Sequence, residues 1–396
     1  MLNLIWLSFF IIAFIVSLVQ WLVFGNIGIF EQLLNSIISM SKVTVEIAIG
    51  LIGILSFWLG MMKIAEAGGV VNWIANAISP LFSRLMPEVP KNHQAFGSIT
   101  MNLSANFLGL DNAATPLGLK AMKDLQEINP KKDTASNAQI LFLVLNTSSV
   151  TLFPISVFVY RAQQGAAVAT DVFLPILLAT FASTIAGLIS VAMFQRISIY
   201  KGVILAYLGA AFAVVAALVV YLLQLSAQQL SEQSSLMGNL LIILVLVCFL
   251  VIAHLKKINV YDTFITGAKE GFEVSIKLIP YLLAMLVGIG VFRASGALDM
   301  IVDSIRTLVA IIGGDTRFVD ALPTAFMKPL SGSGADSFAG RLASIMQGST
   351  ETTFYVLAVY FGSVGIRYSR HAITCGLIAD VAGISAGIAV CYWFFG

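Results

Sequence analysis

The sequence is poor in charge, histidine and cysteine. Charged side chains make up only 11% of its 396 residues, and there are three His and three Cys. The formal net charge is +2 and no tract is strongly basic, so we expect no nucleic-acid partner. The mean hydropathy of +0.94 lies above the range of soluble globular domains, which leaves the class of membrane proteins.

The scarcity of cysteine and histidine argues against two kinds of site. All three cysteines lie in apolar runs, which favours small core residues over a disulfide set: Cys248, Cys375 and Cys391. The three histidines share no metal-ligand spacing: His93, His254 and His371. We therefore predict no metal centre and no cofactor, and consider sodium and protons only as coupling ions.

Catalytic motifs are missing as well. The Gly-rich stretch SGSGADS, residues 331–337, lacks the Lys and the spacing of a phosphate-binding loop. Tyr261-Asp262 and Gly314-Asp315 suggest an intramembrane aspartyl protease only superficially, since we expect loops to hold both pairs. We therefore do not expect an enzyme.

Apolar residues form 59% of the chain and gather in runs long enough to cross about 30 Å of hydrocarbon as helices. The runs lack the alternation of barrel strands, so the sequence predicts an all-α polytopic membrane protein. The first run, Leu2–Phe24, has no basic region and no small-residue cleavage site, so a cleaved signal peptide is the weaker alternative. We predict nine full crossings, near residues 3–24, 44–63, 137–160, 172–195, 202–224, 237–255, 274–293, 350–366 and 372–395.

The basic residues predict the direction of these crossings. The predicted loop 224–236 carries only Glu232 as a charge and is expected outside. Lys131, Lys132 and Arg196 then lie inside, with the N-terminus inside and the C-terminus outside. Five basic residues of the C-terminal half fall outside and depart from the positive-inside rule: Arg293, Arg306, Arg317, Lys328 and Arg341.

The two halves of the chain repeat one another. A constant shift aligns Glu46 with Glu273 and Gly69 with Gly296 without a gap. Each half continues with an amphipathic stretch, a polar break, a Ser/Thr cluster and a closing helix. An odd number of crossings separates the repeats, which predicts the inverted topology typical of secondary transporters. The predicted domains are an N-terminal helix with an external loop (1–43), a first repeat (44–197), two connecting helices (198–266) and a second repeat (267–396).

Within each repeat, two polar features interrupt the apolar sequence. LGLDNAATPLG and LSGSGADSFAG lie in segments 94–122 and 318–347, which we predict to enter the membrane as re-entrant hairpins and return. The amphipathic stretches, Val70–Leu85 and Ala297–Ile312, are predicted to lie at the membrane surface. The Ser/Thr cluster follows the break more closely in the second half, so either that hairpin is tighter or Thr350–Thr353 starts a helix.

Several of these strings resemble a known family. MNLSANFLGLDNAATPLGLKAM resembles the signature of spore maturation protein A, over about residues 1–200. RASGALD, MKPLSGSGADS and QGSTETTFYVLAVYFGSVG resemble spore maturation protein B, over residues 267–396. Both carry the nucleoside-recognition or "gate" domain, whose order of parts is similar to that of concentrative nucleoside transporters. The resemblance implies a transporter-like fold in a bacterial inner membrane, and it does not fix the solute.

Irregular backbone at membrane depth persists only where it is buried in protein or lines a watery cavity. We therefore predict that the polar residues of the breaks and clusters bind a solute: Asn102, Asn106, Asp111, Asn112, Thr115, Asn146, Thr147, Ser148, Ser149, Ser331, Ser333, Asp336, Ser337, Thr350, Glu351 and Thr352. Two alternatives stay open. Thr115 could be a helix cap before Pro116. Asn146–Ser149 could form interhelical hydrogen bonds within a continuous helix.

Carboxylates at membrane depth are costly unless they are paired or used. The candidates for ion coupling are Asp336, Glu351 and Asp380. Asp380 is either a coupling carboxylate or the structural partner of a basic group. The first functional hypothesis is a secondary active transporter that moves a small polar solute by alternating access, with nucleoside-like molecules as one candidate class. The alternative is a non-transporting receptor or assembly partner in the envelope or in spore maturation. Both have the lipid bilayer as a partner, and a homo-oligomer is compatible with either.

Overall fold

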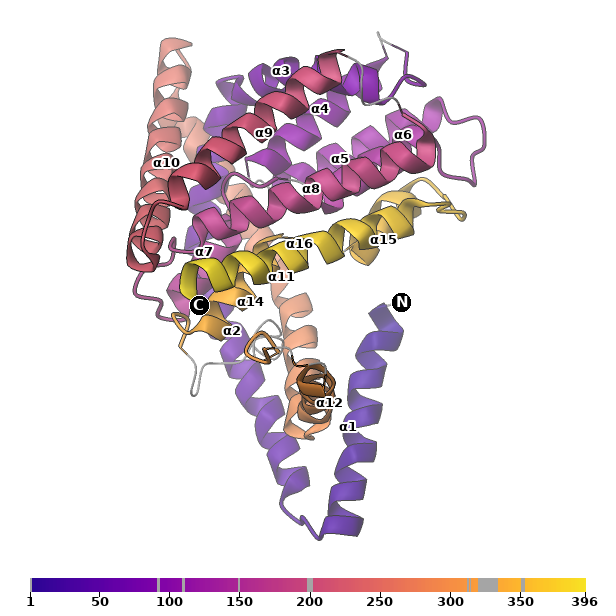
Figure 1. Cartoon of the computed structure of the whole chain (residues 1–396), viewed down its shortest axis with the longest axis vertical. Coiled ribbons are helices and arrows are strands. Elements are labelled where there is room, and N and C mark those ends of the chain that lie inside the picture. Colours follow the sequence, from indigo (N-terminus) through magenta and orange to yellow (C-terminus); the bar gives the residue numbers. More distant parts are fainter. Residues whose placement is uncertain are drawn as a thin grey trace. The chain divides into compact units, whose positions relative to one another are not determined.

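In the part of the chain that it describes, the computed structural model is built from helices (Figure 1). The described residues are 2–90, 93–108, 111–148, 150–197, 202–311, 313, 315–319, 334–349 and 353–396. One isolated bridge joins Thr134 to Tyr368. The predicted all-α polytopic membrane fold is confirmed.

Long apolar helices in the described residues number fewer than the nine crossings predicted. Six are long and apolar enough to span a membrane: α1 (Leu2–Phe24), α2 (Ile29–Ala67), α8 (Phe173–Gln195), α9 (Gly202–Leu222), α10 (Ala227–Leu255) and α16 (Ala372–Phe395). A bent pair, α11 (Val260–Ala294) with α12 (Ala297–Ile311), brings the number to seven if it forms one span.

The difference arises because two predicted crossings are made of short helices. Residues 137–160 contain α6 (Asn137–Thr147) and the first part of α7 (Ile155–Gln163). Residues 350–366 contain only α15 (Thr353–Ser363) in their described part, after α14 (Phe338–Ser349). At about 1.5 Å per residue, none of these helices reaches across 30 Å of hydrocarbon alone.

Helices also replace three segments that the sequence analysis assigned to loops. The predicted external loop before residue 44 is helical from Ile29, and the predicted loop 224–236 is helical from Ala227. Ser226 begins that second helix through a capping box with Gln229. Asp262 likewise lies in the first turn of α11. Polar residues favour loops at these positions, but in the structure they form the ends of long helices that extend beyond the apolar runs.

The two amphipathic stretches form helices, as predicted: α3 (Val70–Leu85) and α12. Each follows a long helix after a glycine in the left-handed region, with φ of 74° at Gly69 and 77° at Gly296. Glycine adopts this conformation without the steric cost that a Cβ brings. The chain therefore leaves α2 and α11 in the same local manner, and α11 and α12 meet at an angle of 68°.

The chain folds into two compact units that are interleaved along the sequence. The first unit comprises Met1–Met61, Arg161–Ala166 and Phe264–Ala343. The second comprises Met62–Tyr160, Ala167–Thr263 and Ser344–Gly396. Each unit thus draws residues from both halves of the sequence.

In the first unit, side chains of α1 donate hydrogen bonds to backbone carbonyls at α11 and the residue after it. The indole Nε1 of Trp6 donates to the carbonyl oxygen of Ala284 at 2.8 Å, and Nε2 of Gln20 donates to that of Ser295 at 3.0 Å. On α11, Gly271 allows close approach to α2, since a Cβ there would lie 2.6 Å from the carbonyl oxygen of Leu55. Small residues and such hydrogen bonds are the usual means of joining helices in lipid.

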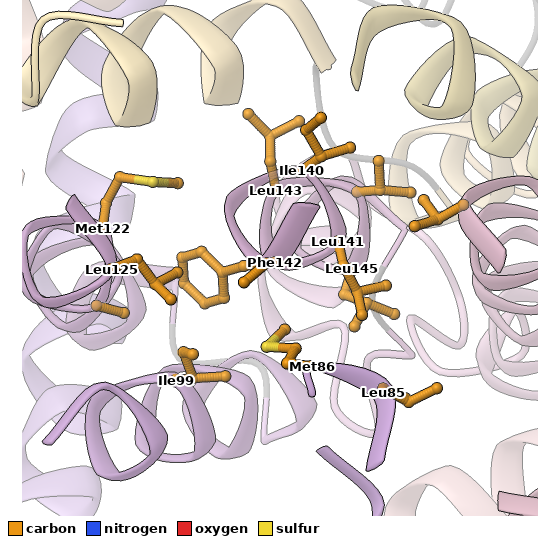
Figure 2. Close-up of a cluster of buried hydrophobic side chains, with 14 of the residues drawn as sticks. Leu85, Met86, Ile99, Met122, Leu125, Ile140, Leu141, Phe142, Leu143 and Leu145 are labelled. Carbon is orange, nitrogen blue, oxygen red and sulfur yellow. The ribbon is translucent and has the colours of Figure 1, made fainter. Parts of the chain in front are cut away.

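The second unit contains a large apolar core centred on α6. All residues of α6 from Ala138 to Thr147 are buried, so this helix has packing partners on every side. Figure 2 shows Phe142 of α6 beside Leu125 of α5 (Asp111–Glu127), with Ile99 of α4 (Gln94–Phe107) close by. Helices α4 and α5 pack against each other as a hairpin.

Two helices of the second unit, α8 and α16, run side by side (Figure 1). Small residues line their contact: a Cβ at Gly187 would lie 3.2 Å from the Cβ of Ala379. The hydroxyl of Ser183 donates to the carbonyl oxygen of Ala379 at 2.9 Å. This close approach brings the middle of α16 against α8.

Two loops of the second unit that carry basic residues are joined by backbone hydrogen bonds. The amides of Arg367 and Tyr368 donate to the carbonyl oxygen of Asp133 at 2.8 and 3.0 Å, and the amide of Ala135 donates to that of Tyr368 at 3.0 Å. Nε2 of Gln195, at the end of α8, donates to the carbonyl oxygen of Asn137 at 3.0 Å. These chain segments therefore lie close together, which is compatible with the predicted orientation.

The orientation can be tested by thiol labelling. We expect a cysteine at Glu232, an exposed position near the start of α10, to react with an impermeant maleimide added to intact cells. A cysteine at Lys131 should react only after permeabilisation, because the positive-inside rule places it in the cytoplasm. Both changes would be made with Cys248, the exposed free cysteine, replaced by Ser. The reverse labelling pattern would overturn the orientation.

His371 should make the stability of the protein depend on pH. Its ring stacks on Phe194 with centroids 5.3 Å apart, and its Nε2 lies 3.1 Å from Nε2 of Gln195. Burial, and then the charge of Arg370, lower the pKa of His371 below its ordinary value of 6.5. The unfolded chain therefore binds more protons between the lowered pKa and 6.5, so the free energy of unfolding falls as the pH drops through this window.

The measurement is thermal unfolding of the detergent-purified protein between about pH 7.5 and pH 5. We expect the Tm of His371→Gln to fall less over this range than that of the original protein. Equal losses in both proteins would show that other groups cause the pH dependence.

Candidate functional site

The hairpin of α4 and α5 carries the first group of predicted site residues. Asn102 and Asn106 lie on α4, and the hairpin turns between Phe107 and Asp111. Thr115 and Pro116 lie inside α5, which begins at Asp111, so the alternative that Thr115 caps this helix is wrong. Pro116 is the sixth residue of α5, so it has no amide hydrogen to donate in the second turn and removes one hydrogen bond within the helix.

Three side chains from three helices meet at one amide oxygen. Oδ1 of Asn146, on α6, accepts a hydrogen bond from Nδ2 of Asn106 at 2.7 Å and one from the hydroxyl of Tyr360, on α15, at 3.3 Å. Nδ2 of Asn146 donates to the carbonyl oxygen of Phe142 at 2.8 Å. The ring of Tyr360 stacks on that of Phe142, with centroids 5.8 Å apart. We call Asn102, Asn106, Asn146 and Tyr360 the amide cluster.

Asn102 adds an oxygen without a protein partner to the amide cluster. Its side chain is fully buried, and Nδ2 donates to the carbonyl oxygen of Ala114 at 2.7 Å. Oδ1 has no hydrogen-bond partner among the described residues. Gly118 of α5 lies against the cluster, since a Cβ there would collide with the hydroxyl of Tyr360 and lie 3.0 Å from Nδ2 of Asn102. Buried amide oxygens are rarely left unpaired, so this atom is available to a ligand.

The predicted interruption after Asn146 is present. Helix α6 ends at Thr147, and the hydroxyls of Thr147 and Ser148 donate to the carbonyl oxygen of Val144 at 2.9 and 2.8 Å. The hydroxyl of Thr184, on α8, donates to the carbonyl oxygen of Ser148. The amide of Leu152 donates to the carbonyl oxygen of Phe107, at the tip of the hairpin, at 2.8 Å. Thus α8 and the hairpin each bond one backbone group of this segment.

Asp380 lies in the second unit, where α15 begins beside α16. Its Oδ2 accepts a hydrogen bond from the hydroxyl of Thr353 at 2.7 Å. Thr353 is the first residue of α15 and is buried. Oδ1 of Asp380 is buried and has no partner among the described residues.

Asp336, in the first unit, has a different environment. Arg161 lies in the last turn of α7. Its Nη2 lies 3.2 Å from Oδ1 of Asp336, and its Nη1 donates to the carbonyl oxygen of Ala335 at 2.7 Å. The Arg161 side chain is only 1% exposed. The hydroxyl of Ser337 accepts from the amide of Gly340 at 3.0 Å, which makes Ser337 a cap of α14. Arg161 was not among the predicted site residues, because it directly follows the predicted crossing 137–160 and was expected at the membrane edge.

The other predicted site residues fall outside the described structure. Six of them are not described: Ser149, Ser331, Ser333, Thr350, Glu351 and Thr352. The backbones of Asp111 and Asn112 belong to α5, but their side chains are not described. Two groups are therefore brought together, the amide cluster and the Thr353–Asp380 pair, both in the second unit. A single cavity shared by all predicted residues stays a prediction.

Comparisons with known proteins match both halves of the chain. A family model described as nucleoside recognition (Gate) matches residues 48–163 and 275–367. Spore maturation protein A of Bacillus subtilis (strain 168) is 38% identical over 189 residues, which cover 48% of this chain and 93% of the relative. Spore maturation protein B of the same organism is 46% identical over 155 residues, which cover 36% of this chain and 85% of the relative. No solved structure gives a significant match.

The contact between Gly118 and Tyr360 can be tested by paired substitutions. Gly118→Ala should lower the free energy of unfolding by about 1–3 kcal/mol, since the added methyl collides with the Tyr360 hydroxyl. Tyr360→Phe should cost about 0.5–1.5 kcal/mol alone, because it removes one hydrogen bond. In the double variant, we expect the second change to restore part of the stability that the first removes.

Thermal and denaturant unfolding in detergent provide the measurement. The matched control is Gly362→Ala, also on α15, where an added Cβ meets nothing within 4 Å. This change should be neutral or stabilising by up to about 1 kcal/mol. Additive losses in the double variant would contradict the packing described for the amide cluster.

Proposed function

The chain belongs to the nucleoside-recognition (Gate) family, and on this premise we propose that it is a secondary active transporter of a small polar solute. It carries out no catalysis in this proposal. The relatives matched by its two halves are named for spore maturation, and the family description names nucleoside recognition. A nucleoside-like molecule is therefore the first solute class to consider.

The observation that carries the proposal is the amide cluster. It gathers uncharged donors and acceptors from a hairpin helix, an interrupted helix and α15 within an apolar core. Amides and a phenol recognise neutral polar groups, such as ring nitrogens, carbonyls and hydroxyls, through directed hydrogen bonds. Oδ1 of Asn102, for which the described residues supply no partner, offers an acceptor to a solute donor.

Transport, as distinct from binding, is supported by the arrangement of elements. Discontinuous helices and hairpins that surround a polar site are the typical moving parts of alternating-access transporters. Helices α2 and α11 both end at a left-handed glycine before an amphipathic helix, as an internal repeat requires. The closing helices of the two proposed repeats, α8 and α16, pack against each other, which is compatible with a pseudo-two-fold axis between them. The inverted topology, the inner-membrane location and the coupling to protons or sodium belong to the same proposal.

A second candidate is a non-transporting receptor or assembly partner. The names of the two relatives favour it, because they record a developmental role rather than a solute. A receptor would use the same amide cluster to bind a solute but would not carry it across a bilayer. Binding and transport must therefore be measured separately.

Solute binding to the amide cluster should raise the thermal stability of the purified protein. The probes are nucleosides, nucleobases, amino acids and sugars added to the whole chain in detergent. A ligand present at about 100 times its Kd should stabilise the folded state by about 2.7 kcal/mol. Asn146→Ala should weaken binding at least about tenfold, equivalent to about 1.4 kcal/mol, because Asn146 is the centre of the hydrogen bonds.

The control is Asn137→Ala, a change of the same residue type at the other end of α6, where Nδ2 donates to Glu88 at the surface. It should leave the Kd unchanged. Uptake of the identified solute into proteoliposomes then separates the two candidates, since a receptor binds without uptake. If Asn146→Ala binds the solute as tightly as the original protein, the amide cluster is not the solute site.

A further inference from the structure

Asp380 is an acidic residue in surroundings that suit a charge poorly. It lies eight residues into α16, a helix long and apolar enough to span the membrane. The start of α15 is fitted closely against it, because a Cβ at Gly376 would lie 2.6 Å from Cγ2 of Thr353. The hydroxyl of Thr353 is thereby held on Oδ2 of Asp380, while Oδ1 is buried without a described partner.

In the described part of the chain, the helices that pack mainly against α16 carry no lysine or arginine. They are α6, α8, α10 and α15, and their sequences contain neither residue, nor does the part of α14 in the second unit, residues 344–349. Their charged or protonatable groups near ordinary pH are Glu232, near the start of α10, and His254, at its end. The other titratable side chains on α15 and α16 are tyrosines and cysteines: Tyr355, Tyr360, Cys375, Cys391 and Tyr392. The three residues that precede α15 in the sequence, Thr350–Thr352, include one acidic residue, Glu351, and no basic residue.

This composition decides between the two alternatives for Asp380. A structural partner would be a basic group, as Arg161 is for Asp336 in the first unit. No described helix against α16 supplies one. An ionised carboxylate held by one hydroxyl at membrane depth is costly, whereas a carboxylic acid carries no charge to bury.

We propose that Asp380 and Thr353 form a proton-binding site, in which a proton adds to Oδ1 of Asp380 from one side of the membrane and leaves to water on the other. This inference rests on the proposed transport function and names its coupling ion. Sodium fits less well, because hard cations in proteins collect several oxygen ligands. Here the described side-chain oxygens are those of Asp380 and Thr353, since the Ser183 hydroxyl is directed to the carbonyl oxygen of Ala379.

The first test needs no solute. Infrared pH titration of the whole chain in lipid, with protons as the only ligand, should show the carbonyl band of one protonated carboxylic acid that is absent in Asp380→Asn. The isosteric amide keeps the acceptor for Thr353, and thermal unfolding checks that it folds. Thr353→Val should move the titration of the same band, because it removes the hydroxyl on Oδ2. If the band is unchanged in Asp380→Asn, Asp380 binds no proton and the inference is wrong, whatever the outcome for transport.

The second test uses the solute found in the thermal-shift screen. An inward gradient of about one pH unit carries enough free energy for about tenfold accumulation per proton in proteoliposomes. We expect the original protein to accumulate the solute and Asp380→Asn only to equilibrate it. The control is Asp124→Asn, a second buried carboxylate that accepts from a hydroxyl, that of Ser98 at 2.7 Å, but near the charged end of α5. It should accumulate like the original protein.

The outcomes separate the two proposals. Accumulation by Asp380→Asn equal to that of the original protein would overturn the coupling role of Asp380 while leaving transport in place. A protonated Asp380 in a protein that binds the solute without uptake would overturn both transport and proton coupling. The loss of accumulation in Asp124→Asn but not in Asp380→Asn would assign the coupling proton to the hairpin instead.

Discussion

The structure depends on one constraint: a hydrogen-bonding group taken into the membrane must find its partner within the protein. Unpaired backbone and side-chain groups cost several kcal/mol in hydrocarbon, so every irregular segment has to be compensated locally. Two backbone groups after α6, the carbonyl of Ser148 and the amide of Leu152, meet this requirement through Thr184 and through the hairpin tip at Phe107. Among the buried atoms that have no partner in the described residues are Oδ1 of Asn102 and Oδ1 of Asp380, which lie at the two places of the second unit where polar side chains gather.

Local features of the fold could be predicted from the sequence because their causes are local. The spacing of apolar residues predicted the bounds of α3, Val70–Leu85, and those of α12 to within one residue. The run of polar residues at Asn146 predicted where α6 ends. The number of crossings could not be predicted in the same way. Apolarity shows that a segment can enter the membrane, but it does not show whether the helix is continuous, as residues 137–160 demonstrate.

The partners within the site could not be predicted for a different reason. Tyr360 joins Asn146 across 214 residues of sequence, and Arg161 joins Asp336 across 175. Such pairs depend on how helices from distant parts of the chain pack, and spacing along one sequence carries no signal of it. For the same reason the sequence could not distinguish the surroundings of Asp336 and Asp380, two candidates for ion coupling. Asp336 has a buried guanidinium beside it, whereas Asp380 accepts from the hydroxyl of Thr353.

The interleaving of the second unit has a consequence for assembly. Its parts come from residues 62–160, 167–263 and 344–396, so the halves that match two separate relatives build one core together. Covalent linkage turns their meeting into an intramolecular event, at effective concentrations that reach the millimolar range for short flexible linkers. It also fixes the stoichiometry of the halves at one to one. Neither half can then accumulate in the bilayer with its share of the common core exposed.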